Sequence, residues 1–244
     1  MTIRPMRLNQ GSSTNHMLAR LPAGSWERWQ SALTLIELQA GEVLFEDQTH
    51  LTHLYFPTSA IVSITHLLRG GESIEVAMIG SEGVAGASSF LGSGLSNHRG
   101  MVLRSGQAYR LSSDWLRLEF ETSPDFLPMM LRYSQALITQ ISQVLACSCH
   151  HPVEQQLSRW LLMYADRADN TTIMFTQEHL ANTLGVRRER LAKAASELKK
   201  KGLIQYSRGS IEICNPRALK ICTCECYGVI SSTFEPLVRP HAQA

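Results

Sequence analysis

The sequence has little charge, few cysteines and no long hydrophobic run. Charged residues make up 18% of the chain and hydrophobic residues 44%, a composition that excludes intrinsic disorder and supplies a buried core. The longest apolar stretches, such as Leu127–Leu131, are soon interrupted by polar residues, and none reaches the roughly 18 apolar residues that a membrane-spanning helix requires. Residues 1–15 contain two arginines with no apolar segment behind them, so no secretory signal is predicted. We therefore expect a soluble, cytoplasmic protein without a membrane partner.

Signatures of several common enzyme sites are also absent. The sequence has no Gly-x-Ser-x-Gly elbow, no Walker phosphate loop and no His-Glu-x-x-His zinc helix. Its Gly92-Ser93-Gly94 segment lacks the third glycine and the strand–helix setting of a dinucleotide site. We therefore predict that the protein is not an enzyme.

The six cysteines are too few and too unevenly placed for a secreted disulfide scaffold. The first is Cys147, and five of the six fall in two short segments, Cys147-Ser-Cys149-His150-His151 and Cys222-Thr-Cys224-Glu-Cys226. Thiolate and imidazole ligands suit zinc or copper(I), but Cys-x-Cys is not the usual Cys-x-x-Cys spacing of a structural zinc site. Two interpretations stay open: a metal or redox role, and simple packing of Cys224 and Tyr227 with neighbouring apolar residues under a C-terminal helix. We assign no metal and no cofactor.

Positive charge is concentrated in one segment. The formal net charge is only +2, yet the stretch from Arg187 to Arg208 holds eight basic and two acidic residues, which gives +6 there and −4 over the rest. A basic segment on a mildly acidic body indicates a polyanionic partner that is contacted locally. The alternative is a solvated helix face with no partner.

The first half of the chain has the pattern of a β domain. Short apolar runs recur between turn residues, as expected for an antiparallel sandwich or barrel. Gly70-Gly71 predicts a hairpin between two of these runs. The runs are Val43–Phe45, Leu54–Phe56, Ala60–Thr65, Ile74–Ile79, Met101–Leu103 and Ala108–Leu111.

A long helix is predicted from Asp125 to about Cys147. Its apolar arc is wider than one partner surface requires, so one side would cover the β domain and the other would pair with a second subunit. The alternative is a helix buried inside a monomer. One stripe consists of Leu127, Leu131, Ile138, Ile141 and Leu145, and a second of Met130, Leu137 and Val144.

The segment from Gln177 to Lys201 predicts two short helices separated by a break at Gly185. Apolar residues line one face of each helix, and Ala181 and Ala194 are small where the helices would cross. This is the requirement of a helix-turn-helix, in which glycine accepts the positive φ of the turn. The two short β runs that follow, around Ser207-Arg208-Gly209, predict a wing.

The stretch LANTLGVRRERLAKAASELKKKGLIQYSRGSIEI, residues 180–213, resembles the C-terminal domain of the Crp/Fnr superfamily of bacterial transcription regulators. The β-rich half, long helix and winged helix follow in that family's order over about residues 25–215. The resemblance implies an α+β fold: an N-terminal β jelly roll of cyclic-nucleotide-binding type, a long dimerisation helix and a C-terminal winged helix-turn-helix.

The same resemblance implies a set of DNA-binding residues. The family's Arg-Glu pair at the start of the recognition helix falls on Arg188 and Glu189, and its later basic residue on Lys193. The residue after the Glu is usually small in that family but is Arg190 here, so the resemblance does not define the DNA sequence that is read. The full predicted set is Arg187, Arg188, Glu189, Arg190, Lys193, Lys199 and Arg208.

The resemblance also bears on the sensor domain. Members that bind cyclic AMP use a Glu for the ribose and an Arg for the cyclic phosphate. Here the Glu position is Ala87, while Arg99 stands about where the Arg would be. We expect Arg99 and Ser88 to bind an effector, without dependence on cyclic AMP. The iron–sulfur members use N-terminal cysteines, which this chain lacks before Cys147.

The predicted organisation is a flexible N-terminus (1–15), a cyclic-nucleotide-binding-like sensor domain (16–122), a dimerisation helix (123–150), a winged helix-turn-helix domain (151–226) and a C-terminal tail (227–244). The predicted function is sequence-specific transcription regulation by a homodimer on an inverted repeat of double-stranded DNA. RNA polymerase and an unknown small-molecule effector are further expected partners. The alternative is a metal- or redox-responsive cysteine sensor whose winged helix contacts protein.

Overall fold

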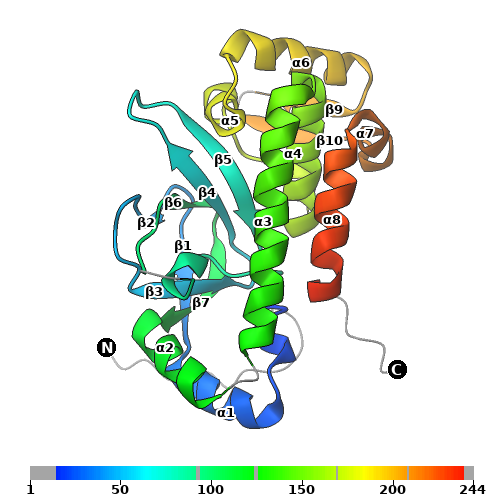
Figure 1. Cartoon of the computed structure of the whole chain (residues 1–244). Helices are drawn as coiled ribbons and strands as arrows, with labels where there is room; N and C mark the ends of the chain where they lie inside the picture. The colour runs from blue at the N-terminus through cyan, green and yellow to red at the C-terminus, as the bar shows by residue number, and fades with distance from the viewer. Residues whose placement is uncertain (1–14, 92–93, 124–125, 169, 208, 239–244) are drawn as a thin grey trace.

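The computed structural model describes residues 15–91, 94–123, 126–168, 170–207 and 209–238. A β-rich N-terminal part lies beside the long helix α3, and a smaller, mainly helical part adjoins the far end of that helix (Figure 1). Of the segment predicted to be flexible, residues 1–14 lie outside the described residues. Asn15 is buried, and its Nδ2 donates to the carbonyls of Pro57 and Gly83 at 3.0 and 2.8 Å, so the expectation of flexibility is wrong for this residue.

The N-terminal part is the predicted antiparallel β domain. Its strands form two sheets, one in the order β1-β7-β3 and the other in the order β2-β6-β4-β5. The predicted hairpin joins β4 to β5, and Gly71 in its turn has a φ of 90°. The elements are η1 (Leu18–Arg20), α1 (Ala23–Ala32), β1 (Thr34–Leu38), β2 (Val43–Phe45), β3 (His53–Pro57), β4 (Ile61–Leu67), β5 (Ser73–Ile79), η2 (Ala87–Ser89), β6 (Arg99–Arg104), β7 (Gly106–Ser112) and α2 (Ser113–Thr122).

The rest of the chain is mainly helical. Helix α3 runs over Leu127–His150, which agrees with the predicted long helix to within three residues at each end. A three-stranded sheet in the order β8-β10-β9 lies among the later helices. These elements are α4 (Val153–Ala168), β8 (Thr172–Ile173), α5 (Gln177–Leu184), α6 (Arg188–Lys200), β9 (Ile204–Ser207), β10 (Ser210–Ile213), α7 (Pro216–Cys222) and α8 (Glu225–Val238).

The prediction of a C-terminal tail over residues 227–244 is corrected by the structure. Residues 225–238 form helix α8, which packs along α3 (Figure 1). The reason is its apolar face, because Tyr227, Ile230, Phe234 and Leu237 are all buried. Residues 239–244 lie outside the described residues.

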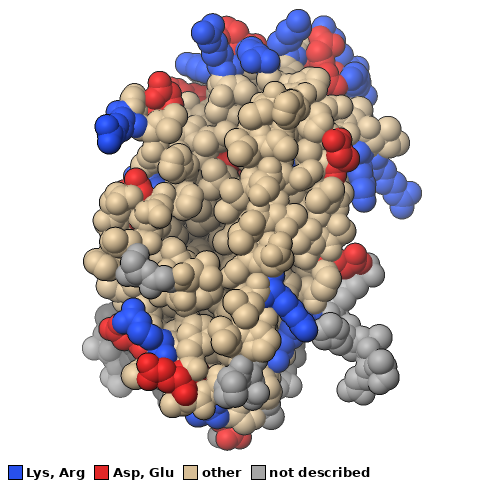
Figure 2. Space-filling view, in the orientation of Figure 1, with Lys and Arg blue, Asp and Glu red and all other residues tan. Residues whose placement is uncertain are grey.

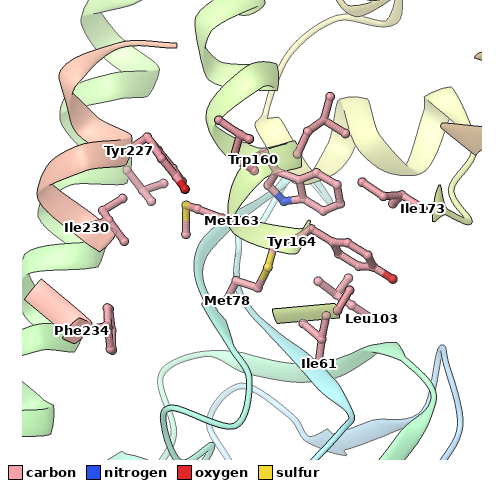
Figure 3. Close-up of a cluster of buried hydrophobic side chains, with 14 of the residues drawn as sticks. Ile61, Met78, Leu103, Trp160, Met163, Tyr164, Ile173, Tyr227, Ile230 and Phe234 are labelled. Atoms are coloured by element: carbon pink, nitrogen blue, oxygen red, sulfur yellow. The ribbon is translucent and has the colours of Figure 1, made fainter. Parts of the chain in front are cut away.

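The two parts of the molecule share one apolar core. Ile61, Met78 and Leu103 come from the β domain, and they belong to the same buried cluster as Trp160 and Tyr164 of α4 (Figure 3). Because burial of apolar surface is the main stabilising contribution, separating the two parts would expose large side chains. The helical part is therefore held firmly against the β domain in this structure.

Two buried carboxylates reinforce this junction. Glu75 of β5 accepts hydrogen bonds from Trp160 Nε1 at 2.8 Å and from the Ser63 hydroxyl at 2.6 Å. Glu82, just after β5, pairs with Arg167 of α4 at 2.7 Å, and both side chains are buried. Burial raises the pKa of Glu75 to about 7, although the hydrogen bonds from Ser63 and Trp160 and the charges of Arg159 and Arg167 favour its ionised form.

The raised pKa of Glu75 predicts a pH-dependent stability. The folded chain holds the Glu75 proton more tightly than the unfolded chain, so this group's contribution is full below about pH 4.5 and is lost as the pH rises to about 7. Glu75→Gln keeps a neutral group that can accept from Trp160. We compare the free energy of unfolding of the variant with that of the wild type at each pH. This difference should be more favourable to the variant at pH 8 than at pH 5, by up to about 3 kcal/mol, measured by denaturant titration.

Glu72→Gln is the control, because Glu72 is exposed in the turn of the same hairpin. It should change the stability equally at both pH values. Equal destabilisation by Glu75→Gln at pH 5 and pH 8 would contradict the assignment of a buried, proton-binding carboxyl.

Candidate nucleic-acid interface and sensor cavity

Helices α5 and α6 form the predicted helix-turn-helix. The side chain of Thr176 caps α5 by accepting from the backbone N–H of His179 at 3.1 Å. Helix α5 ends at Gly185, whose φ of 63° lies in the left-handed region that favours glycine. The chain then turns within a few residues and α6 begins at Arg188. The prediction of a glycine-dependent turn is confirmed.

The packing of α6 decides which of its side chains face outward. Leu191, Ala194, Ala195 and Leu198 are buried against α4 and α5. Ala181 of α5 is buried too, and the small side chains of Ala181 and Ala194 suit the close crossing of the two helices. Since one face of α6 is fully used in the core, its opposite face is turned to solvent.

That outward face carries the predicted base-reading residues. Arg187, Arg188, Glu189, Arg190 and Lys193 are all exposed. The guanidinium of Arg188 makes one long contact of 4.0 Å with Glu178 of α5, and both side chains remain about two-thirds exposed. Figure 2 shows Lys and Arg side chains gathered over α6 at the top of the molecule. The face therefore combines positive charge with side chains that have room to reach a partner.

The far end of α6 and the wing complete this surface. Lys199 is exposed, whereas Lys200 pairs with Glu197 at 2.9 Å and Lys201 pairs with Glu154 of α4. Strands β9 and β10 form the predicted hairpin beside α6. Arg208, predicted to contact DNA from the tip of this hairpin, lies outside the described residues.

A second surface of interest is the outer stripe of α3. Leu131, Ile138 and Leu145 follow one another at intervals of seven residues, and they are 57%, 56% and 62% exposed. Met130 and Val144, from the other predicted stripe, are buried. The wide apolar arc therefore divides only in part as predicted: Leu131, Ile138 and Leu145 remain more than half exposed, whereas Ile141 of the same predicted stripe packs against the β domain.

The sensor domain contains a small cavity against α3. Its volume is about 170 Å³, below the roughly 300–1,000 Å³ usual for ligand pockets. Ser88 lines it, but Arg99 is not among its lining residues, and the Arg99 guanidinium pairs with Glu46 at 3.1 Å. The structure therefore does not bring the two predicted effector-binding residues to one cavity wall.

The cavity wall is mostly apolar. The described polar residues that line it are Ser88, Ser96, Ser134 and His98. Burial, together with the nearby His66, lowers the pKa of His98, so its imidazole is neutral at physiological pH. Among the described lining residues there is thus no cation that would pair with a phosphate.

One arrangement was not predicted from the sequence. Cys147 and His151, at the end of α3, meet Cys224 and Cys226, beside the start of α8, with their ligand atoms all within 4.8 Å of one another. Burial raises the pKa of Cys147 and of Cys226 above the usual thiol range. Cys149 and Cys214 are exposed and do not belong to this group. The two cysteine segments were the available signal, but 77 residues separate Cys147 from Cys224, so only the fold could show that they meet.

Two protein-family models match the chain. A cyclic nucleotide-binding domain matches residues 35–122, and a Crp-like helix-turn-helix domain matches residues 155–222. Comparison with curated proteins finds no match. Among the described residues, no helix is both long and apolar enough to cross a membrane.

Solved structures of similar fold cover most of the chain. FixK2 from Bradyrhizobium japonicum is 15% identical, with a TM-score of 0.66 over 79% of this chain and 98% of that chain. A putative transcriptional regulator of the Crp/Fnr family from Eubacterium rectale is 15% identical, with a TM-score of 0.68 over 83% of this chain and 94% of that chain. The c-di-GMP responsive global regulator CLP from Xanthomonas campestris is 17% identical, with a TM-score of 0.66 over 80% and 100%. At these identities the likeness is one of fold.

Proposed function

Because this chain belongs to the Crp/Fnr superfamily of transcription regulators, we propose that it is a homodimer that binds an inverted repeat of double-stranded DNA in a sequence-specific manner. The observation that carries the proposal is the start of α6, where an exposed row of basic side chains projects from a helix-turn-helix. A helix presented in this way fits the major groove, with its first turns against the base edges.

The residues of α6 take different roles in this proposal. Arg188 and Glu189 lie in the first turn, where an arginine can bond guanine bidentately and a glutamate can accept from cytosine. Arg187, Arg190 and Lys193 read bases or fix the position of the helix. Lys199 and Arg208 contact phosphates, which hold the protein in register without carrying sequence information.

The second chain binds through the outer stripe of α3. Three exposed apolar side chains at seven-residue intervals lie on one side of the helix, as the seam of a helix pair requires. Pairing two copies of α3 would bury this stripe and place two copies of α6 on one side of the dimer. Two-fold symmetry of the protein then matches two half-sites about 34 Å apart, one turn of DNA.

The sensor cavity supports a regulator that does not depend on cyclic AMP. Ala87 supplies no carboxylate for the ribose, Arg99 is engaged by Glu46, and the wall is mainly apolar. An effector of this cavity would be small and largely uncharged, with Ser88 as a hydrogen-bonding residue. Contact with RNA polymerase remains a prediction from the sequence.

The proposal is tested by selecting from random duplexes with the purified chain, without added nucleotide. The wild-type protein should enrich an inverted repeat. On that repeat, Arg188→Ala should weaken binding by about 1–3 kcal/mol and relax the preference at one base position of each half-site, because a bidentate base contact is lost. Both effects are measured by fluorescence anisotropy with a set of single-base variants.

The matched control is Arg117→Ala, which removes the same charge from α2, where Arg117 is 63% exposed and pairs only loosely with Asp114. It should leave both affinity and base preference unchanged. If Arg188→Ala and Arg117→Ala behave alike, α6 is not the reading helix. If the wild-type chain enriches no sequence with or without cyclic AMP, the proposed function is wrong.

The dimer is tested by placing a charge in the outer stripe of α3. Leu131→Glu should weaken self-association by about 2 kcal/mol or more, roughly 30-fold in the dissociation constant, because two carboxylates would be buried next to each other in the helix pair. Sedimentation equilibrium measures the effect. The chain should still fold, since Leu131 is 57% exposed within one subunit.

Leu118→Glu provides the comparison, because Leu118 of α2 is 62% exposed but lies outside the stripe. This variant should remain as dimeric as the wild type. A monomeric wild-type chain at micromolar concentration, or equal effects of the two variants, would contradict pairing through α3.

A further inference from the structure

Three cysteines and one histidine meet at the joint between the long helix and the C-terminal helix. Cys147 and His151 lie one turn apart at the end of α3, and Cys224 and Cys226 lie at the start of α8. The three thiols are almost completely buried, with exposed fractions of 0%, 7% and 1%, and they form a cluster of their own beside the main core. These are soft ligands gathered from two distant parts of the chain.

Two of the ligand-atom distances within the group are close to those around a single tetrahedral ion, and all six lie within 4.8 Å. With zinc–sulfur bonds of about 2.3 Å and a zinc–nitrogen bond of about 2.05 Å, neighbouring ligand atoms lie about 3.8 Å apart for two sulfurs and about 3.6 Å for a sulfur and a nitrogen. Here Cys147 Sγ and Cys224 Sγ are 3.6 Å apart, and Cys226 Sγ and His151 Nδ1 are 3.4 Å apart. A cubane iron–sulfur cluster, in which each ligand binds a different iron, would require the four ligand atoms to lie farther apart.

The histidine is held as a metal ligand would be. Its Nδ1 faces the sulfur of Cys226, while its Nε2 faces a carboxylate oxygen of Glu225 at 3.4 Å. Ligating histidines usually donate their second ring N–H to a carboxylate or carbonyl, which fixes the tautomer and the ring orientation. Glu225 thus supplies an acceptor on the side of the ring that points away from the sulfurs.

The surroundings also balance the charge of such a site. Three thiolates, a neutral imidazole and a divalent ion sum to one negative charge. Arg159 of α4 is buried, its Nε has no hydrogen-bond partner among the described residues, and it interacts with the side chain of Cys147. A buried cation beside the thiols therefore compensates for the excess charge.

We propose that Cys147, His151, Cys224 and Cys226 bind one Zn²⁺ per chain. Because all four positions are filled by protein side chains, the site is structural and leaves no open position for catalysis. The ion ties the start of α8 to the end of α3, next to the point where the chain passes into the helix-turn-helix unit. The inference does not depend on DNA binding, and its test does not use DNA.

The test begins with the metal content of the full-length chain, purified in reducing buffer with any affinity tag removed. Elemental analysis should find about one zinc per wild-type chain. Cys149→Ser should retain the zinc, because Cys149 lies two residues from Cys147 on α3 but is exposed and outside the group. Cys226→Ser should lose it.

A second variant keeps all four ligands and leaves the fold intact. Glu225→Gln removes only the carboxylate behind His151 and should weaken zinc binding by about 10- to 100-fold, measured by competition with a chromophoric chelator. Glu212→Gln, at an exposed position in β10, should not change the affinity. Equal affinities for the two variants would mean that Glu225 does not orient a ligand.

Spectroscopy of the wild-type chain settles the coordination without relying on variants. X-ray absorption at the zinc edge should show three sulfur ligands and one nitrogen ligand, with zinc–sulfur distances of about 2.3 Å. The proposal is overturned by a chain that holds no zinc above trace, by iron with acid-labile sulfide, by oxygen-dominated coordination, or by a Cys147–Cys224 disulfide in protein isolated under reducing conditions.

Discussion

The two-sided packing of α3 is the constraint on which the rest of the structure depends. Its inner side contributes Met130, Tyr133 and Val144 to the core, and the hydroxyl of Tyr133 donates to the carbonyl of Val84 at 2.8 Å. Its outer side leaves a straight apolar stripe in contact with water. Burying one side fixes the β domain against the helix, and the cost of hydrating the other favours association with a second copy. In the proposed dimer, this one helix would link the cavity of the β domain, the pairing of the subunits and the spacing of the two copies of α6.

If the proposed regulator has an effector, the contacts between β5 and the helical part are the direct connection from its cavity to α6. Helix α5 packs directly on β5, and α4 reaches the same strand through the hydrogen bond from Trp160 to Glu75. The sensor cavity is lined by Ile79 at the end of this strand and by Ile138 on α3. A ligand that separated these two residues would act both on the strand that supports α5 and on the helix through which we propose that the subunits pair. This arrangement requires no long relay through the molecule.

Much of the architecture was predictable because local chemistry and tertiary structure agree. Gly185 ends a short amphipathic helix in a conformation that suits glycine, and the apolar arc of α3 predicted a buried side, which Met130 and Val144 form. The prediction from sequence failed for the C-terminal segment, whose structure depends on contacts with residues far away in the chain. Residues 227–238 contain Gly228 and Pro236, which disfavour a helix, yet packing on α3 outweighs their low propensity. Effector binding by Arg99 stays a prediction, and only the fold shows that its guanidinium lies beside Glu46.

In the proposed dimer, pairing through α3 holds two copies of α6 one helical turn of DNA apart. The most direct test inserts about five base pairs, half a helical turn, between the halves of the selected inverted repeat. The second half-site then lies on the opposite face of the duplex, so the affinity should fall to that of a single half-site. An affinity that does not change with this insertion would mean that the two recognition helices are not held at a fixed spacing, and the account of α3 would be wrong.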